Sequence, residues 1–447
     1  MAQLLSESNN MTRAWPGVLR IALGVVLLLF SLLNLFPAPA FALWLAAIVV
    51  SEYSVFWILL SLLLLLGGLG LRRFRNAGTW ILFIAILLFV IPLVEALVAA
   101  SDFPTSFVYQ FPAPGFQAER GGQPASGSQA EQSGHQGVNS SPASKAMSVH
   151  SPGSLSHNSA AVMSPEPLVS PINFVRLFDL GHDHFFPFKN LEYSKVGGIR
   201  LTLDFYQPSG TGLTPCVVVI HGGAWSGGNS QQLPELNSVL AAKGYAVASV
   251  NYRLAPASQS PAPLEDVKNA LSYLSVHAAE LHIDTGNIVL LGRSAGAQIA
   301  LLAAYTLHSK NIRGVVDFYG PADMIFGYSR PSNPRVLNSR KVMEDYLGGT
   351  YSQVPDAYRQ SSPIEFATVS SPPTLILHGG DDVLVDFEHS RRLNNKLHLL
   401  GVRHYLLTLP WATHGFDYNL NGPGGQLSTY LVEGFLKSVI KPPVSPN

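Results

Sequence analysis

The sequence holds one cysteine among 447 residues, which excludes an internal disulfide and a zinc site built from cysteines. That residue, Cys216, lies in the apolar segment PCVVVI, so we expect a packed, unreactive thiol. Charge is also scarce: Asp, Glu, Lys and Arg make up 13% of the chain, and 28 basic residues balance 28 acidic ones. Since no basic stripe is present, we expect no binding of nucleic acid.

Charge is scarcest in the N-terminal region, where three long apolar runs follow one another. Residues 17–36 are long enough to cross a bilayer, and so are residues 79–100, in which Pro92 predicts a kink. Residues 41–70 are too long for one upright span and contain Glu52. The sequence therefore predicts three transmembrane spans, or four if the middle run splits near the segment SEYS.

Arginines flank the first and the last of these runs, at positions 13 and 20 and at positions 72, 73 and 75. Basic flanks favour the cytoplasmic side of a membrane. Both groups can lie there only if an even number of spans separates them, which favours three spans in total. The part of the chain after Ala100 is then expected on the extracytoplasmic side of an integral membrane protein.

Two changes in composition divide the rest of the chain. Residues 101–170 are rich in Ser, Gly, Pro, Ala and Gln without a periodic apolar pattern, which predicts a disordered linker. In residues 171–447, apolar strand-like segments alternate with helical ones, which predicts an α/β domain: a mostly parallel sheet with helices on both faces. We therefore predict a transmembrane helical region over residues 1–100, the linker, and an α/β domain over residues 171–447.

Residues that can carry chemistry follow three predicted strands, and reactive groups gather at the carboxyl ends of strands in such sheets. Residues 221–225, HGGAW, offer glycines whose backbone can approach a substrate oxygen. The segment GRSAG places Ser294 in a tight turn between a strand and an alanine-rich helix. Asp381 and Asp382 follow a third strand, and His414 lies in a later loop. On this architecture, the residues of a catalytic triad occur along the chain in the order serine, acid, histidine.

Residues 190–441 resemble a known superfamily through the segments HGGAW, GYAVASVNYRLAP, PLEDVKNALSYL, GRSAGAQIALLAA, PPTLILHGGDDVLV and THGF. They are similar to α/β-hydrolases, in particular to hormone-sensitive-lipase-like and bacterial feruloyl-esterase-like carboxylesterases. Two positions depart from the pattern. Arg293 stands where many relatives have an acidic or uncharged residue, and the first motif is His-Gly-Gly-Ala rather than His-Gly-Gly-Gly. Alanine still offers its N–H, so the second departure bears on selectivity more than on activity.

The resemblance implies a serine esterase with defined roles. His414 is expected to remove the Ser294 proton, because an imidazole titrates near neutral pH. Asp382 or its neighbour Asp381 would hold the other ring nitrogen. The family pattern His-Gly-x-x-Asp-x-x-Val, completed by Val385, favours Asp382.

The surroundings of the nucleophile are predicted in the same way. The oxyanion hole is expected from the N–H groups of Gly223, Ala224 and Ala295. Trp225 and Tyr252 are candidate substrate-binding residues of an acyl pocket. Residues 321–363 have the length and polarity of a partial lid. We expect no metal and no cofactor, because residues 181–186, GHDHFF, lack further ligands.

The sequence thus predicts a membrane-anchored serine hydrolase that cleaves a small-molecule or lipid carboxylic ester through an acyl-enzyme. An amidase, formamidase or peptidase on the same fold would use the same groups. A non-catalytic hydrolase-like module is a further alternative. Few charges accompany Glu52 and Glu95 in the apolar region, which favours a simple anchor over a transporter or receptor.

Overall fold

The computed structural model describes residues 2–68, 75–112, 171–180, 186–210 and 212–441. Most of the linker predicted over residues 101–170 lies outside these ranges, and so do the basic positions 72 and 73. The histidines of the GHDHFF segment also lie outside the described residues.

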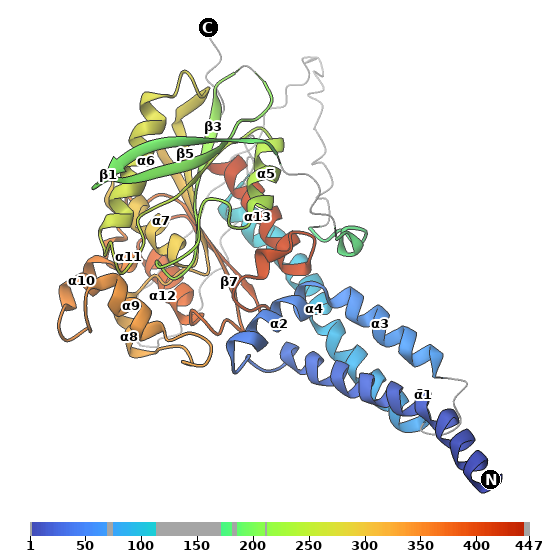
Figure 1. Cartoon of the computed structure of the whole chain (residues 1–447). Coiled ribbons are helices and arrows are strands. Elements are labelled where there is room, and N and C mark those ends of the chain that lie inside the picture. The colour runs from blue at the N-terminus through green and yellow to red at the C-terminus, as the bar shows by residue number, and fades with distance from the viewer. Residues whose placement is uncertain (1, 69–74, 113–170, 181–185, 211, 442–447) are drawn as a thin grey trace, which may run out of the picture. The chain divides into compact units, whose positions relative to one another are not determined.

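In the described part of the chain, eight strands form one sheet in the order β1-β2-β4-β3-β5-β6-β7-β8 (Figure 1). β2 pairs antiparallel with β1 and β4, and all the other neighbouring strands are parallel. The mostly parallel sheet predicted from the sequence is therefore present, with an antiparallel edge. The strands are β1 (Phe188–Val196), β2 (Ile199–Tyr206), β3 (Thr214–Ile220), β4 (Ala246–Val250), β5 (Ile283–Arg293), β6 (Ile312–Phe318), β7 (Thr374–Gly379) and β8 (His404–Leu409).

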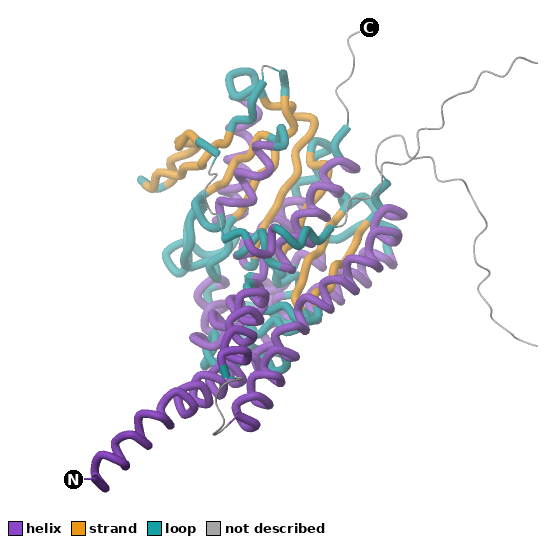
Figure 2. Tube along the Cα trace, turned by 90° about the vertical axis from the view of Figure 1, so that its right-hand side faces the viewer, coloured by secondary structure: helices purple, strands orange, loops and turns teal. Residues whose placement is uncertain are grey.

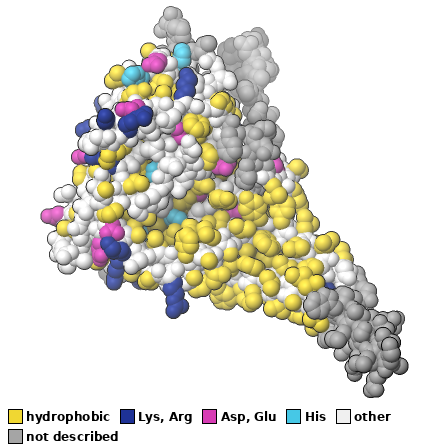
Figure 3. Space-filling model, viewed as in Figure 1, with side chains coloured by type: hydrophobic (Ala, Val, Ile, Leu, Met, Phe, Trp, Pro, Cys, Tyr) yellow, Lys and Arg dark blue, Asp and Glu magenta, His cyan; other side chains and the backbone are white. Residues whose placement is uncertain are grey.

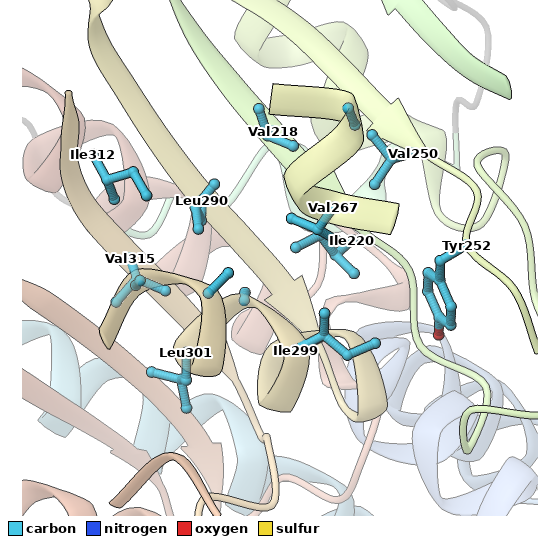
Figure 4. Packing of buried hydrophobic residues seen from close by; sticks show 14 of the residues in the cluster. Val218, Ile220, Val250, Tyr252, Val267, Leu290, Ile299, Leu301, Ile312 and Val315 are labelled. Atoms are coloured by element: carbon cyan, nitrogen blue, oxygen red, sulfur yellow. The ribbon is translucent and has the colours of Figure 1, made fainter. Parts of the chain in front are cut away.

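Alternate residues of the central strands enter two hydrophobic cores, one on each face of the sheet. Val218 and Ile220 of β3 belong to the core that includes α7 (Ala295–Thr306), shown in Figure 4. Val219, which lies between them in the sequence, belongs to the other core. Because both faces are covered, these strands are apolar throughout rather than alternating. Cys216 is a buried free cysteine in this strand, as predicted.

Helices cover both faces of the sheet (Figure 2). Residues of α6, α7 and α12 contribute to one core, and residues of α5 and α13 to the other. The residues predicted to form a partial lid, 321–363, lie between β6 and β7. They hold the short helices α8 to α10, and α11 begins at their end. The helices besides α7 are α5 (Pro234–Ala242), α6 (Ala262–Val276), α8 (Met324–Ser329), α9 (Ser339–Leu347), α10 (Pro355–Gln360), α11 (Pro363–Phe366), α12 (Glu388–Leu399) and α13 (Pro423–Val439).

The described residues of the apolar N-terminal region form four α-helices, and the face seen in Figure 3 is largely hydrophobic. Two stretches, Gly17–Asn34 and Ala77–Ser101, are long and apolar enough to cross a membrane. The helices are α1 (Ala2–Ser31), α2 (Phe41–Glu52), α3 (Ser54–Gly67) and α4 (Arg75–Gln110).

The middle apolar run is not one helix. α2 and α3 meet at Tyr53 with a bend of 81°, within the segment SEYS. The described residues therefore hold two candidate spans, or up to three if the bent pair is one span. α4 also continues past the boundary predicted at residue 100. Its Phe107, and Phe111 just after its end, pack into the core beside α13.

Glu52, the isolated charge of this run, lies at the N-terminus of α13. Its Oε2 accepts a hydrogen bond of 2.9 Å from the Gly424 N–H, and its backbone carbonyl accepts one of 3.0 Å from the Asn419 side chain. A Cβ at Gly422 would come within 2.5 Å of the same carboxylate, so glycine leaves the space that this approach needs. A carboxyl oxygen at a helix N-terminus is favourable, because it accepts hydrogen bonds from N–H groups that lack intrahelical acceptors. Glu52 therefore fixes α2 to the α/β domain.

Replacing Glu52 by alanine is expected to destabilise the full-length protein by about 1–3 kcal/mol, because a buried N–H of Gly424 loses its acceptor. Thermal unfolding in detergent measures the effect. Glu52→Gln keeps an acceptor oxygen and should lose less. In the control Glu192→Ala, an exposed pair with Arg200 is removed, at a cost below about 1 kcal/mol. Unchanged stability of Glu52→Ala would contradict this account of the docking.

Candidate active site

Ser294 lies in a strained turn between β5 and α7. Its backbone has φ 53° and ψ −121°, a conformation that side-chain-bearing residues rarely adopt. Glycines make the turn possible: a Cβ at Gly292 would come within 2.3 Å of the Gly296 carbonyl oxygen, and a Cβ at Gly296 within 2.2 Å of the Ile220 carbonyl oxygen. The Gly-x-Ser-x-Gly pattern thus has a steric reason in this fold, and it presents a half-buried serine at the end of a central strand.

Asp382 and His414 are hydrogen-bonded to each other. The distance between His414 Nδ1 and Asp382 Oδ2 is 2.6 Å, and the Asp382 side chain is fully buried. The other carboxylate oxygen accepts hydrogen bonds from the backbone N–H groups of Leu384, at 2.8 Å, and Val385, at 2.9 Å. These turn amides fix the orientation of the carboxylate toward the imidazole.

The electrostatics of this pair determine where the proton lies. Burial alone would raise the pKa of Asp382, but the neighbouring His414 and His378 outweigh it, and the pKa lies below its usual range. An ionised carboxylate only accepts hydrogen bonds, so His414 Nδ1 carries the hydrogen of the 2.6 Å contact. In the neutral ring, Nε2 is then left as an acceptor, which is the state that a general base needs.

A second histidine, to which the sequence analysis assigns no role, also contacts Asp382. His378 Nε2 lies 3.2 Å from Asp382 Oδ2, and its Nδ1 lies 2.6 Å from the Ser390 hydroxyl. Burial lowers the pKa of His378, yet the hydrogen bond and charge of Asp382 outweigh it and raise that pKa. Its place at the end of β7, four residues before the acid, is the signal that points to it.

Asp381 occupies different surroundings. Its backbone N–H donates to the Ala412 carbonyl at 3.0 Å, and the residue lines a small separate hollow beside Phe36 and Trp411. Partial burial raises the pKa of its carboxyl. Of the two neighbouring acids, Asp382 is the one in contact with His414.

Ser294 and His414 line one cavity of about 520 Å³. The residues predicted for the oxyanion hole, Gly223, Ala224 and Ala295, line it as well. Gly223 has φ 114° and Ala224 φ 52°, so the backbone turns sharply at the carboxyl end of β3. Ala295 is the first residue of α7, and its N–H therefore has no intrahelical acceptor. The cavity thus brings together a hydroxyl, an imidazole and backbone amides.

The two candidate substrate-binding residues differ in their position relative to the cavity. Trp225 lines the cavity and is held there, since its Nε1–H donates to the Gln298 side chain at 2.9 Å and its ring stacks on Tyr346 at 4.5 Å between centroids. Tyr252 is not among the described residues that line the cavity. Its hydroxyl donates to the His221 carbonyl at 3.0 Å and its ring stacks on the His221 imidazole, so it supports the HGGAW turn from behind. The assignment of Tyr252 to the pocket is therefore corrected.

Arg293, the unusual residue before the nucleophile, belongs to a buried ion pair. Its Nε donates to Asp417 Oδ2 at 2.5 Å, and the Tyr319 hydroxyl donates to the other oxygen of the same carboxylate. The Tyr319 ring in turn lies 4.3 Å from the His414 imidazole, between centroids. Asp417 follows the THGF segment directly, but no role was predicted for it from the sequence. This cluster packs behind the imidazole and supports its position.

Separate exchange of the two neighbouring acids for asparagine tests the assignment. Asp382→Asn is expected to lower kcat for a soluble ester by about 10⁴-fold, because an amide no longer holds the histidine in the required tautomer. Asp381→Asn is the matched control and should change kcat by less than about tenfold, since its carboxyl does not contact His414. Steady-state kinetics measure both. A deep defect in Asp381→Asn alone would reverse the assignment.

Comparisons with known proteins agree with this fold. Residues 203–397 match the family model BD-FAE. The chain is 28% identical over 288 residues to the probable carboxylic ester hydrolase LipM of Mycobacterium tuberculosis, covering 60% of this chain and 64% of LipM. It is 29% identical over 241 residues to the esterase LipC of the same organism, covering 50% of this chain and 58% of LipC. The chain therefore spans less than two thirds of the length of these relatives.

Among solved structures, a bacterial heroin esterase superposes with a TM-score of 0.51 at 23% sequence identity, over 60% of this chain and 88% of that protein. At this identity the likeness concerns the fold alone. Together with the family match and the two mycobacterial relatives, it supports the α/β-hydrolase esterase family. The chain has an α/β-hydrolase esterase fold with a mixed, mostly parallel sheet.

Proposed function

We propose that this protein is a membrane-anchored serine hydrolase that cleaves carboxylic esters, with Ser294 as nucleophile, His414 as general base and Asp382 as the acid that orients the base. The observation that carries the proposal is the cavity lined by Ser294 and His414, with His414 hydrogen-bonded to a buried carboxylate. The likeness to LipM and LipC, which are named as a carboxylic ester hydrolase and an esterase, supports an ester substrate.

In the proposed reaction, His414 Nε2 accepts the proton of the Ser294 hydroxyl while Oγ attacks the ester carbonyl carbon. The imidazolium that forms is stabilised by ionised Asp382 across the 2.6 Å hydrogen bond. The oxyanion accepts hydrogen bonds from the N–H of Ala295 and from those of Gly223 and Ala224. Each such donor contributes about 3 kcal/mol to stabilising the transition state.

Collapse of this intermediate breaks the bond to the alcohol oxygen, which leaves with the proton from His414. The acyl group then remains on Ser294 as an ester. A water molecule, deprotonated by the same imidazole, attacks the acyl carbonyl. The carboxylic acid departs, and the proton returns to Ser294 Oγ.

In the Ser294→Ala variant, kcat for p-nitrophenyl esters is expected to fall by on the order of 10⁶-fold, because the turn between β5 and α7 no longer carries a hydroxyl group. The variant should also fail to react with a fluorophosphonate probe that labels the wild type. Ser309→Ala, in an exposed loop, is the matched control and should keep both properties. Parallel assays on aryl formamides separate an esterase from a formamidase. Undiminished ester turnover in Ser294→Ala would remove the serine from the mechanism.

We further propose that the α/β domain lies on the extracytoplasmic side. Arg20 in α1 donates from Nε to the Leu64 carbonyl of α3 at 2.9 Å, and from Nη2 to the Thr79 hydroxyl of α4 at 3.2 Å. The start of the first apolar run, the end of α3 and the start of α4 therefore lie together. The basic positions 13, 72, 73 and 75 adjoin this end in the sequence, which supports placing it in the cytoplasm.

Cysteine labelling in intact cells that express the full chain tests this orientation. The native Cys216 is buried, so it should react little. Ser309→Cys, in an exposed loop of the α/β domain, is expected to react with a membrane-impermeant maleimide from outside. Ser8→Cys, which precedes the first apolar run and is proposed to be cytoplasmic, should react only after permeabilisation. The reverse pattern would place the domain in the cytoplasm.

A further inference from the structure

One helix of the apolar N-terminal region forms part of the wall of the candidate active-site cavity. Phe41, Trp44, Leu45 and Ile48 of α2 all line it. Their spacing of three and four residues places them on one face of the helix. The cavity that holds Ser294 is therefore completed by a segment outside the α/β domain.

This face of α2 is held in place by directional contacts. The Trp44 indole N–H donates to the backbone carbonyl of His414 at 3.0 Å. The Phe41 N–H donates to the Arg335 carbonyl at 3.1 Å, at the beginning of the helix. Glu52 anchors the other end through the N-terminus of α13. With both ends and the middle tied to the α/β domain, α2 is a fixed part of the site.

Apolar side chains outside α2 line the same cavity. Val342 and Met343 of α9 line it, and so does Leu337, which precedes that helix. Leu384 and Val385, from the turn that holds Asp382, line it as well. Together with the residues of α2, these side chains offer a hydrocarbon chain several apolar contacts.

The cavity wall continues onto a surface suited to lipid. Phe41 and Leu45 line the cavity and yet remain 51% and 46% exposed. α3, which follows α2, exposes Leu63 to 70% and Leu66 to 63%. In water such a continuous apolar surface would be costly, whereas in a bilayer it is the expected contact with lipid. Phe41 and Leu45 thus belong both to the cavity wall and to this exposed apolar surface, which gives an apolar chain a route between the two.

We propose that the substrate is an amphipathic lipid ester whose long apolar chain enters from the bilayer and lies along α2, with its ester group at Ser294. The proposal rests on the serine hydrolase function proposed above and names its substrate class. It gives the N-terminal region a part in substrate selection besides anchoring. A short soluble ester reaches the serine without using α2.

The test compares full-length protein in mixed micelles on p-nitrophenyl palmitate and p-nitrophenyl acetate. Ile48→Trp fills the cavity beside α2 and is expected to lower kcat/KM for the palmitate ester by about tenfold more than for the acetate ester. Val49→Trp is the matched control, because Val49 is the next residue, is 41% exposed and does not line the cavity. It should leave both substrates unchanged.

Labelling by a fluorophosphonate shows whether Ile48→Trp keeps a competent Ser294. If it does not fold, Ile48→Ala replaces it, and the enlarged cavity should shift the optimum chain length upward. An equal loss on both esters, or an unchanged chain-length profile in both variants, would overturn the role of α2. Absence of hydrolysis and labelling in the wild type would instead overturn the proposed function, and this inference with it.

Discussion

The hydrogen bond between Asp382 and His414 is the contact on which the proposed chemistry depends, and several elements converge to hold it. Turn amides at Leu384 and Val385 fix the carboxylate. On the other side, the Tyr319 ring packs on the imidazole, and the Trp44 indole holds the backbone of His414. Because Trp44 belongs to α2, the geometry of the base depends on a helix from the apolar region as well as on the α/β domain. Loss of that helix would free both the base and the cavity wall.

The α/β-hydrolase fold could be predicted from local features of the sequence. The strand–turn–helix pattern, and the small residues that the turn requires, are neighbours in the chain. Gly292 and Gly296 have to be glycine for Ser294 to occupy its turn, so the Gly-x-Ser-x-Gly motif by itself predicts the geometry of the turn. The mostly parallel sheet follows in the same way from apolar strands that alternate with helices. Because β5 to β8 are parallel, their carboxyl ends lie at one edge of the sheet, and there Ser294 and His414 line one cavity.

Other features depend on contacts between distant segments, which no local pattern encodes. α2 is apolar on every side, so its sequence cannot tell which face meets the cavity and which meets lipid. Glu52 reads as an isolated charge until its contact with Gly424, far along the chain, is known. Tyr252 has an aromatic side chain of the kind that lines acyl pockets, but it lies in the interior, where its hydroxyl donates to the His221 carbonyl. Asp417 was missed because only the fold brings it to Arg293.

An experimental structure of the full chain, reacted with a long-chain alkyl phosphonate, would test the central claim most directly. The account predicts phosphorus bonded to Ser294 Oγ, the phosphoryl oxygen within hydrogen-bond distance of the Ala295 N–H, and the alkyl chain against Trp44 and Ile48. His414 would face the adduct with Asp382 behind it. A phosphonate attached to another residue, or an imidazole turned away from Ser294, would contradict the assignment of the site.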